Sequence, residues 1–252
     1  MKYMGSKSRI VKDILPLMLD YDYNNFYDVF CGSCSVIQEV PKHFNRIAND
    51  KNRFLISMWK FLVETKLEFP MRISKDSYSR WRFIYNGQKG KDVYEINSDN
   101  AMIGWFGFMG SYNGRFFDGG YSGHAVMIKD GKYRDYIGEN IKHTLSQVPK
   151  LDGVRFTCCD YMNLSILPNS IIYCDPPYKG VKKYTYEINH DDFWEWCRVK
   201  VKEGHKVFIS EYNAPEDFVC IWDAKLKTCI NQTITKDATE RLWVHKSQVD
   251  SI

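Results

Sequence analysis

The sequence has few of the features that mark membrane, secreted or repetitive proteins. No run of 18 apolar residues occurs among its 252 residues, so we expect no transmembrane helix and no membrane partner. The first residues contain neither the apolar region nor the small-residue cleavage site of a signal peptide, so we expect no secretion and a cytoplasmic location. Internal repeats, low-complexity tracts and long Pro/Ser linkers are also absent, which excludes a repeat architecture.

Disulfide bonds and metal ligands are not suggested by the cysteine spacing. None of the eight cysteines lies between Cys34 and Cys158, which does not suit a disulfide scaffold, so we expect reduced thiols. Cys158 and Cys159 are adjacent rather than spaced as a C-x-x-C pair, and no zinc or other metal site is expected. Hydrophobic residues make up 44% and charged residues 26%, a balance that argues against a disordered chain.

The net charge of +4 is small, but its distribution is uneven. Residues 60–150 contain 14 Lys and Arg against 10 Asp and Glu, whereas the rest of the chain contains 21 of each. The whole excess therefore lies in the middle of the chain. Such an excess is compatible with contact to nucleic acid or with chance, because it is modest for a segment of this length.

Strands and helices alternate in the two flanks of the chain. We expect strands at residues 26–30, 46–49, 154–157, 170–174 and 206–210, and helices at 10–19, 35–40, 52–63 and 191–201. The first of these helices is expected to begin near Ser6 or Ser8. This alternation predicts an α/β domain with a largely parallel sheet.

The middle of the chain does not follow that pattern. Residues 70–148 are rich in Gly, Tyr, Phe, Asn and Arg, and residues 104–115 are the densest case. So many glycines among aromatics predict neither a good helix nor a regular strand. We therefore expect an inserted subdomain that interrupts the α/β domain.

The strongest chemical signal is Asp175-Pro176-Pro177-Tyr178, which directly follows an apolar strand. Two prolines cannot continue a central strand, so the chain turns rigidly at the carboxyl end of that strand, where parallel sheets bind ligands. Asp175 and the Pro176 carbonyl can accept both N–H bonds of a planar exocyclic amine, and Tyr178 can stack on its ring. The motif therefore indicates an amine-binding site, with a Pro-Pro turn and a surface Tyr as the plain structural alternative.

A second signal runs from Asp28 to Cys34, where a strand passes through small residues into a helix. The small residues let a ligand approach the backbone, and a helix N-terminus offers free N–H groups. Asp50 follows about 20 residues later, at the end of the next strand, where an acid in a doubly wound fold binds ribose hydroxyls. These residues predict a nucleotide-like cofactor site.

Cys31-Gly32-Ser33-Cys34 also has the spacing of a thioredoxin-like dithiol. The chain is over twice the usual length of such a domain, and neither Asp50 nor Asp175 would have a role in it. A dithiol oxidoreductase therefore remains an alternative of a different class.

Together these residues resemble the α-group DNA adenine-N6 methyltransferases, the Dam-like or D12-class enzymes that use S-adenosylmethionine. Lys2 to Lys7 looks like the first cofactor motif of that family, and Asp28-x-Phe30-x-Gly32 looks like its glycine loop. Asp50 matches the acid that holds the ribose, and Asp175 to Tyr178 matches the catalytic motif, in the right order with the insertion between.

Further segments extend the resemblance over most of both flanks. Cys159-Asp160-Tyr161 resembles the Asp-aromatic pair beside the adenine of the cofactor, and Ser210 to Asn213 resembles a later motif. One departure is Cys34, which stands where the last glycine of the loop is expected; its side chain would crowd the methionine part of the cofactor or merely the helix packing. The resemblance implies cofactor contacts from the following residues: Tyr3, Lys7, Asp28, Phe30, Gly32, Asp50, Asp160, Tyr161 and Asp175.

The resemblance implies a Rossmann-like methyltransferase sheet interrupted by a target-recognition subdomain. Residues 1–64 and 150–252 would form the catalytic domain that binds S-adenosylmethionine, and residues 65–149 the inserted subdomain. The expected partner is double-stranded DNA, in a bacterial or phage-infected cell. A cognate restriction endonuclease of a restriction-modification pair is a possible functional partner but not a stable subunit.

The mechanism implied by the resemblance is methyl transfer to N6 of an adenine flipped out of the duplex. Asp175, Pro176, Pro177 and Tyr178 would form the catalytic motif, with Asp175 and the Pro176 carbonyl holding the amine and Tyr178 stacking on the base. Lys7 would lie near the charged end of the cofactor or be a solvated lysine before a helix.

The insertion would read the DNA. Arg80, Arg82 and Arg115 would contact phosphates or guanine edges, and Asn113 an adenine edge. Each of these residues alone can equally be a plain surface residue. Tyr112-Asn113-Gly114 resembles part of a target-recognition segment and leans faintly toward GATC-like sites.

Two alternatives remain close to this interpretation. The same four residues at 175–178 suit the N4 amine of cytosine, because any exocyclic amine fits them. A catalytically inactive DNA-binding relative is the other, and Cys34 is the sequence feature that favours it.

Overall fold

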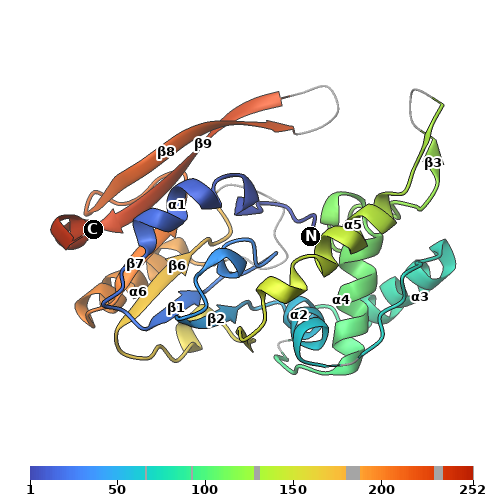
Figure 1. Ribbon diagram of the computed structural model, residues 1–252, viewed down its shortest axis with the longest axis horizontal. Coiled ribbons are helices and arrows are strands. Elements are labelled where there is room, and N and C mark those ends of the chain that lie inside the picture. The colour runs from blue at the N-terminus through green and yellow to red at the C-terminus, as the bar shows by residue number, and fades with distance from the viewer. Residues whose placement is uncertain (66, 92, 128–130, 180–187, 230–234, 252) are drawn as a thin grey trace.

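Seven strands form one sheet in the computed structural model, which describes residues 1–65, 67–91, 93–127, 131–179, 188–229 and 235–251 (Figure 1). The strand order is β5-β2-β1-β6-β7-β9-β8. β5 (Arg155–Thr157), β2 (Asn45–Asn49), β1 (Asn25–Asp28), β6 (Ser170–Cys174) and β7 (Lys206–Ser210) pair in parallel. β9 (Thr235–His245) lies antiparallel between β7 and β8 (Phe218–Cys229). The predicted α/β, Rossmann-like class with a largely parallel sheet is confirmed.

The parallel strands are buried on both faces, because helices cover both sides of the sheet. Phe26 and Ile171 belong to one hydrophobic cluster, while the next residues, Tyr27 and Ile172, belong to another on the opposite face. The covering helices are α1 (Val11–Met18), α2 (Arg53–Glu64) and α6 (His190–Lys202). Within the described residues, no helix is long and apolar enough to cross a bilayer.

The middle of the chain forms a helical layer beside the sheet. Its elements are α3 (Lys75–Asn86), α4 (Ser98–Gly110), the small hairpin of β3 (Val126–Met127) and β4 (Tyr133–Arg134), and α5 (Tyr136–Leu145). Short 3-10 turns connect the elements: η1 (Lys7–Arg9), η2 (Ile37–Glu39), η3 (Tyr112–Gly114), η4 (Val148–Lys150), η5 (Tyr161–Asn163) and η6 (Lys246–Ser251). The N-terminal segment runs between the sheet and this helical layer (Figure 1).

The expectation that residues 104–115 form no good helix is wrong for residues 104–110, which belong to α4. The glycines of α4 face neighbouring elements at very short range. A Cβ at Gly104 would collide with the Phe54 carbonyl oxygen of α2, and one at Gly107 would collide with the Phe116 ring. The glycines are therefore packing residues: Gly104 lets α4 approach α2, and Gly107 makes room for the Phe116 ring. These tertiary contacts outweigh their low helix propensity. Asn97 caps the helix by accepting a hydrogen bond from the Asn100 N–H.

Two other expected helices are shorter in the structure. The segment 35–40 forms only the 3-10 turn η2, and the helix expected over 10–19 begins at Val11 after the turn η1. Both changes leave the backbone of residues 3–7 and 31–36 close to the carboxyl edge of the sheet, where it borders a cavity.

Candidate active site

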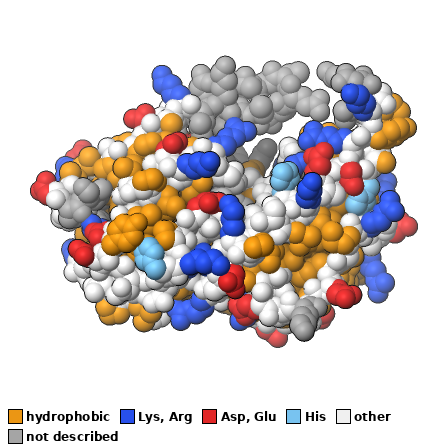
Figure 2. Space-filling model, viewed as in Figure 1, with side chains coloured by type: hydrophobic (Ala, Val, Ile, Leu, Met, Phe, Trp, Pro, Cys, Tyr) orange, Lys and Arg blue, Asp and Glu red, His pale blue; other side chains and the backbone are white. Residues whose placement is uncertain are grey.

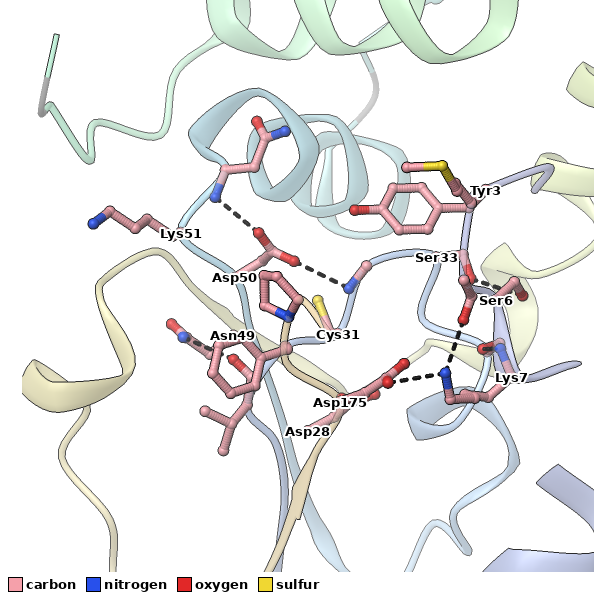
Figure 3. A pocket seen from close by; sticks show the side chains of 18 of the residues that line it. Tyr3, Ser6, Lys7, Asp28, Cys31, Ser33, Asn49, Asp50, Lys51 and Asp175 are labelled. Atoms are coloured by element: carbon pink, nitrogen blue, oxygen red, sulfur yellow. Dashed lines mark hydrogen bonds and ion pairs between the residues drawn. The ribbon is translucent and has the colours of Figure 1, made fainter. Parts of the chain in front are cut away.

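One cavity opens at the carboxyl edge of the parallel strands, beside the N-terminal segment with Tyr3, Ser6 and Lys7 (Figure 3). β1 ends in Asp28, β2 is followed by Asp50, and β6 is followed by Asp175, so the register of the sheet brings three carboxylates to one edge. Every residue expected to contact a cofactor lines this cavity: Tyr3, Lys7, Asp28, Phe30, Gly32, Asp50, Asp160, Tyr161 and Asp175.

Asp50 is held by two backbone amides. Its Oδ1 accepts the Asn52 N–H at 2.8 Å, and its Oδ2 accepts the Gly32 N–H at 3.2 Å. Burial raises the pKa of Asp50 to about 6, although both hydrogen bonds act in the opposite direction. The carboxylate thereby ties the loop after β1 to the end of β2.

The loop after β1 requires left-handed backbone at two positions. Gly32 has a φ of 45°, and a Cβ there would lie 2.8 Å from Cε1 of Tyr3. Cys34 has a φ of 56°, in the region that glycine adopts without strain. The family resemblance predicts a glycine at position 34, and the backbone conformation there is one that favours glycine. The Cys34 side chain is fully buried in the hydrophobic cluster and does not line the cavity.

Lys7 is a buried cation between two carboxylates. Its Nζ lies 2.9 Å from Asp175 Oδ1 and 3.6 Å from Glu240 Oε2, and it donates to the Gly5 carbonyl at 3.2 Å. Burial acts to lower the pKa of Lys7, but Asp175 and Glu240 outweigh it and the pKa is raised. Lys7 therefore remains charged and binds the Asp-Pro-Pro-Tyr turn directly.

Asp175 has a perturbed acidity. Burial raises its pKa to about 6, and the charge of Lys7 limits the rise. Such perturbation at the end of a strand, beside a cavity, is typical of functional carboxylates.

Pro176 and Tyr178 are buried and are not among the residues that line the cavity. The Tyr178 hydroxyl donates to Glu240 Oε2 at 2.9 Å, its ring packs edge-on against Tyr212 with centroids 4.5 Å apart, and Lys7 Nζ lies 4.8 Å from its centroid. Only 7% of the residue is exposed. Pro177 lines the cavity beside it.

Two more buried acids surround this group. Burial raises the pKa of Asp28 well above its ordinary value, and Asp28 Oδ1 has no hydrogen-bond partner in the described part of the chain. Burial raises the pKa of Glu211 to about 7, although its carboxylate accepts the Tyr212 and Lys179 N–H groups. The edge of the sheet therefore gathers several carboxyl groups around Lys7, and burial favours the protonated forms of Asp28 and Glu211.

The opposite end of the cavity is bordered by an ion pair. Asp160 Oδ2 lies 2.9 Å from Lys51 Nζ, while Asp160 Oδ1 accepts the Met162 N–H and caps η5. Tyr161, 5% exposed, packs against Phe30 with centroids 5.6 Å apart. Lys51 lines the cavity and was not anticipated; its position directly after Asp50 was the available signal.

The residues expected to read DNA divide into two groups. Arg80 and Arg82 are exposed on α3, and Tyr112 and Asn113 are exposed in η3. Arg115 instead lines the cavity and pairs with Asp118 at 2.8 Å. Figure 2 shows Lys and Arg side chains on both sides of the hollow in the upper part of this face.

The dithiol alternative is disfavoured by burial. Cys31 and Cys34 are 5% and 0% exposed, and burial raises the pKa of both thiols. Thiol–disulfide exchange needs an accessible thiolate, which this setting opposes. In the part of the chain that the structure describes, no group of three or more His, Cys, Asp and Glu is arranged to hold a metal.

Two comparisons relate this chain to known proteins. The model of a family described as D12 class N6 adenine-specific DNA methyltransferase matches residues 3–232. The type II methyltransferase M.FokI of Planomicrobium okeanokoites is 24% identical over 222 residues, which cover 79% of this chain and 32% of that protein. The match therefore spans about a third of the length of that relative.

Proposed function

Because the chain belongs to the D12 class of N6 adenine-specific DNA methyltransferases, we propose that it transfers a methyl group from S-adenosylmethionine to N6 of an adenine flipped out of duplex DNA. The observation that carries this proposal is the cavity at the edge of the sheet, where a motif suited to an exocyclic amine adjoins a set of residues suited to a nucleoside cofactor.

The chemistry of the cavity fits S-adenosylmethionine. Asp28 contributes a buried oxygen without a partner among the described residues, and a cationic ligand group beside it would restore the ionised carboxylate that burial disfavours. The close packing of Gly32 against Tyr3 leaves no room for a side chain in the loop wall. When bound, the cofactor supplies an activated methyl group. Asp50 would hold its ribose, and Asp28 would hold its methionine part.

Asp175 and its turn would bind the acceptor amine. Lys7 holds the carboxylate at 2.9 Å, and a carboxylate accepts several hydrogen bonds, so Asp175 can still accept one from an amine. The Pro176 carbonyl would accept the second N–H, and Tyr178 would stack on the ring. The contribution of these groups is orientation and electrostatics, since acceptors for the two N–H bonds favour a tetrahedral nitrogen whose lone pair points at the methyl group.

The helical layer would hold the DNA around the flipped base. Arg80 and Arg82 are exposed for phosphate contacts, and Tyr112 and Asn113 are exposed in a loop that Tyr78 fixes through a 3.0 Å hydrogen bond to Ser111. Flipping costs a few kcal/mol, and contacts from this layer would offset it. Residues 65–149 are accordingly proposed as the target-recognition subdomain, and 1–64 with 150–252 as the catalytic domain.

The test is transfer of tritium from labelled S-adenosylmethionine to mixed-sequence duplex DNA, followed by nucleoside analysis. We expect the label in N6-methyladenine. Label found only in N4-methylcytosine would identify cytosine, and not adenine, as the acceptor base. DNA binding without turnover at saturating cofactor would support an inactive relative. Insulin reduction that is lost in Cys31→Ser would support the dithiol alternative. A cognate endonuclease would cut the unmethylated form of the DNA site that this methylation protects.

A further inference from the structure

Glu240 is a partly buried carboxylate at a strand position where the pattern favours an apolar residue. Leu242 and Val244, which share its face of β9, are 0% exposed and belong to the hydrophobic cluster against the sheet. The Glu240 side chain is 12% exposed. A carboxylate at such a position is costly unless other groups bind it, so its partners indicate why it is there.

Those partners are two groups of the amine-binding site. Glu240 Oε2 accepts the Tyr178 hydroxyl at 2.9 Å and lies 3.6 Å from Lys7 Nζ. Lys7 in turn binds Asp175 at 2.9 Å. One carboxylate from β9 therefore links the aromatic and the acidic ends of the Asp-Pro-Pro-Tyr turn.

The backbone around Glu240 is clamped to the segment that follows β7. Arg241 donates from Nη1 to the Tyr212 carbonyl, and Trp243 donates from Nε1 to the Glu211 carbonyl at 2.8 Å. Tyr212 is also the residue that packs edge-on against Tyr178. These two hydrogen bonds fix the position of Glu240 relative to the Asp-Pro-Pro-Tyr turn.

We propose that Glu240 is a positioning residue for methyl transfer, which anchors the Tyr178 ring by its hydroxyl and holds Lys7 beside Asp175 before a base enters. The inference rests on the proposed function, since Tyr178 and Asp175 are base-binding groups only there. Glu240 itself touches neither the base nor the cofactor. Its removal frees the Tyr178 ring and leaves Lys7 with Asp175 as its remaining carboxylate partner in the described site.

The test compares four variants with the wild-type protein. Glu240→Ala removes both contacts, Glu240→Gln keeps an acceptor for Tyr178 but loses the charge near Lys7, and Tyr178→Phe removes only the hydroxyl. The double variant Tyr178→Phe/Glu240→Ala measures their coupling. Asp223→Asn is the matched control, because it removes an exposed carboxylate from the same hairpin.

The expected kinetic result is a loss of kcat with little change in cofactor KM. Glu240→Ala lowers kcat about 10- to 100-fold, and Glu240→Gln about 3- to 10-fold, as expected for removal of hydrogen bonds to a charged group. The KM for S-adenosylmethionine stays within about twofold, because Glu240 does not line the cofactor cavity. Asp223→Asn keeps wild-type kinetics. In the Tyr178→Phe background the effect of Glu240→Ala becomes at least about threefold smaller.

A second readout needs no activity. The Tm losses of Tyr178→Phe and Glu240→Ala fall short of additivity in the double variant by about 2 to 4 °C. Wild-type kcat in Glu240→Ala and Glu240→Gln, or fully additive effects, would overturn the inference while the proposed function stands. If Glu240→Ala does not fold, wild-type kcat in the near-isosteric Glu240→Gln overturns it. Absence of methyladenine from wild type and Asp223→Asn alike would remove the proposed function and this inference with it.

Discussion

Replacing Lys7 with methionine would test the electrostatics of the site. Lys7 places an ammonium with 6% side-chain exposure between Asp175 at 2.9 Å and Glu240 at 3.6 Å. Methionine has a similar length and no charge, so the substitution keeps the packing and leaves two partly buried carboxylates without their shared cation. The variant Lys7→Met therefore isolates the charge.

The magnitude follows from burial. Removing one partner of a buried ion pair costs about 3 to 5 kcal/mol, whereas an exposed pair contributes at most about 1 kcal/mol. The loss depends on pH, because the pKa of Asp175 is already raised to about 6 and rises further without Lys7. A carboxyl group whose pKa is higher in the folded than in the unfolded state destabilises the protein as pH rises through the folded value. The loss in Lys7→Met is therefore largest at pH 8 and smaller at pH 5.

Urea unfolding of the wild type and the variant at pH 5 and pH 8 measures this difference. Lys42→Met is the matched control, because Lys42 pairs with Asp152 at 3.2 Å with side-chain exposures of 62% and 78%. The control should lose less than about 1 kcal/mol at either pH. A loss in Lys7→Met that is equally large at both pH values, or no larger than the control, would refute the reasoning.

Three other predictions follow from the site and its support. Asp175→Ala abolishes methylation while circular dichroism stays unchanged; normal turnover would remove the proposed role of the turn. The methylation rate of the wild type rises with pH through about 6, because burial raises the pKa of Asp175 and Asp50 to about 6 and both are proposed to act ionised; a flat profile from pH 5 to 8 would contradict this. Gly104→Ala lowers the free energy of unfolding by about 1 to 3 kcal/mol or more, because its Cβ would collide with the Phe54 carbonyl. The control Gly87→Ala changes the free energy of unfolding by less than about 0.5 kcal/mol, because Gly87 has a φ of −69° and the nearest atom to its Cβ would be 3.5 Å away. Equal effects of the two substitutions in urea unfolding would contradict the packing argument.

The sheet and its acidic edge could be predicted from the sequence because parallel strands are short apolar runs that end in polar turns. The bounds expected for β6 and β7 agree with the structure, Ser170–Cys174 and Lys206–Ser210. Once the strands are parallel, their carboxyl ends share one edge, so Asp28, Asp50 and Asp175 come together without further information.

The glycine-rich helix and Glu240 could not be predicted because tertiary contacts determine both. The glycines of α4 read as helix breakers until the close approach of α2 is known. β8 and β9 contain many charged residues and were not anticipated as strands, so nothing in the sequence placed Glu240, some 60 residues after Tyr178, beside its hydroxyl. Cys34 read as a departure from a glycine loop, but whether its side chain faces a ligand or the core required the structure.

The most direct test of the central claim is the methylation rate of wild type and Asp175→Ala on the same DNA, with tritiated S-adenosylmethionine and identification of the labelled nucleoside. We predict N6-methyladenine from the wild type and no label above background from the variant, with calorimetry showing that the wild type binds the cofactor and circular dichroism showing that the variant is folded. Label in DNA from both proteins at similar rates, or cofactor binding without labelled adenine from the wild type, would contradict the account.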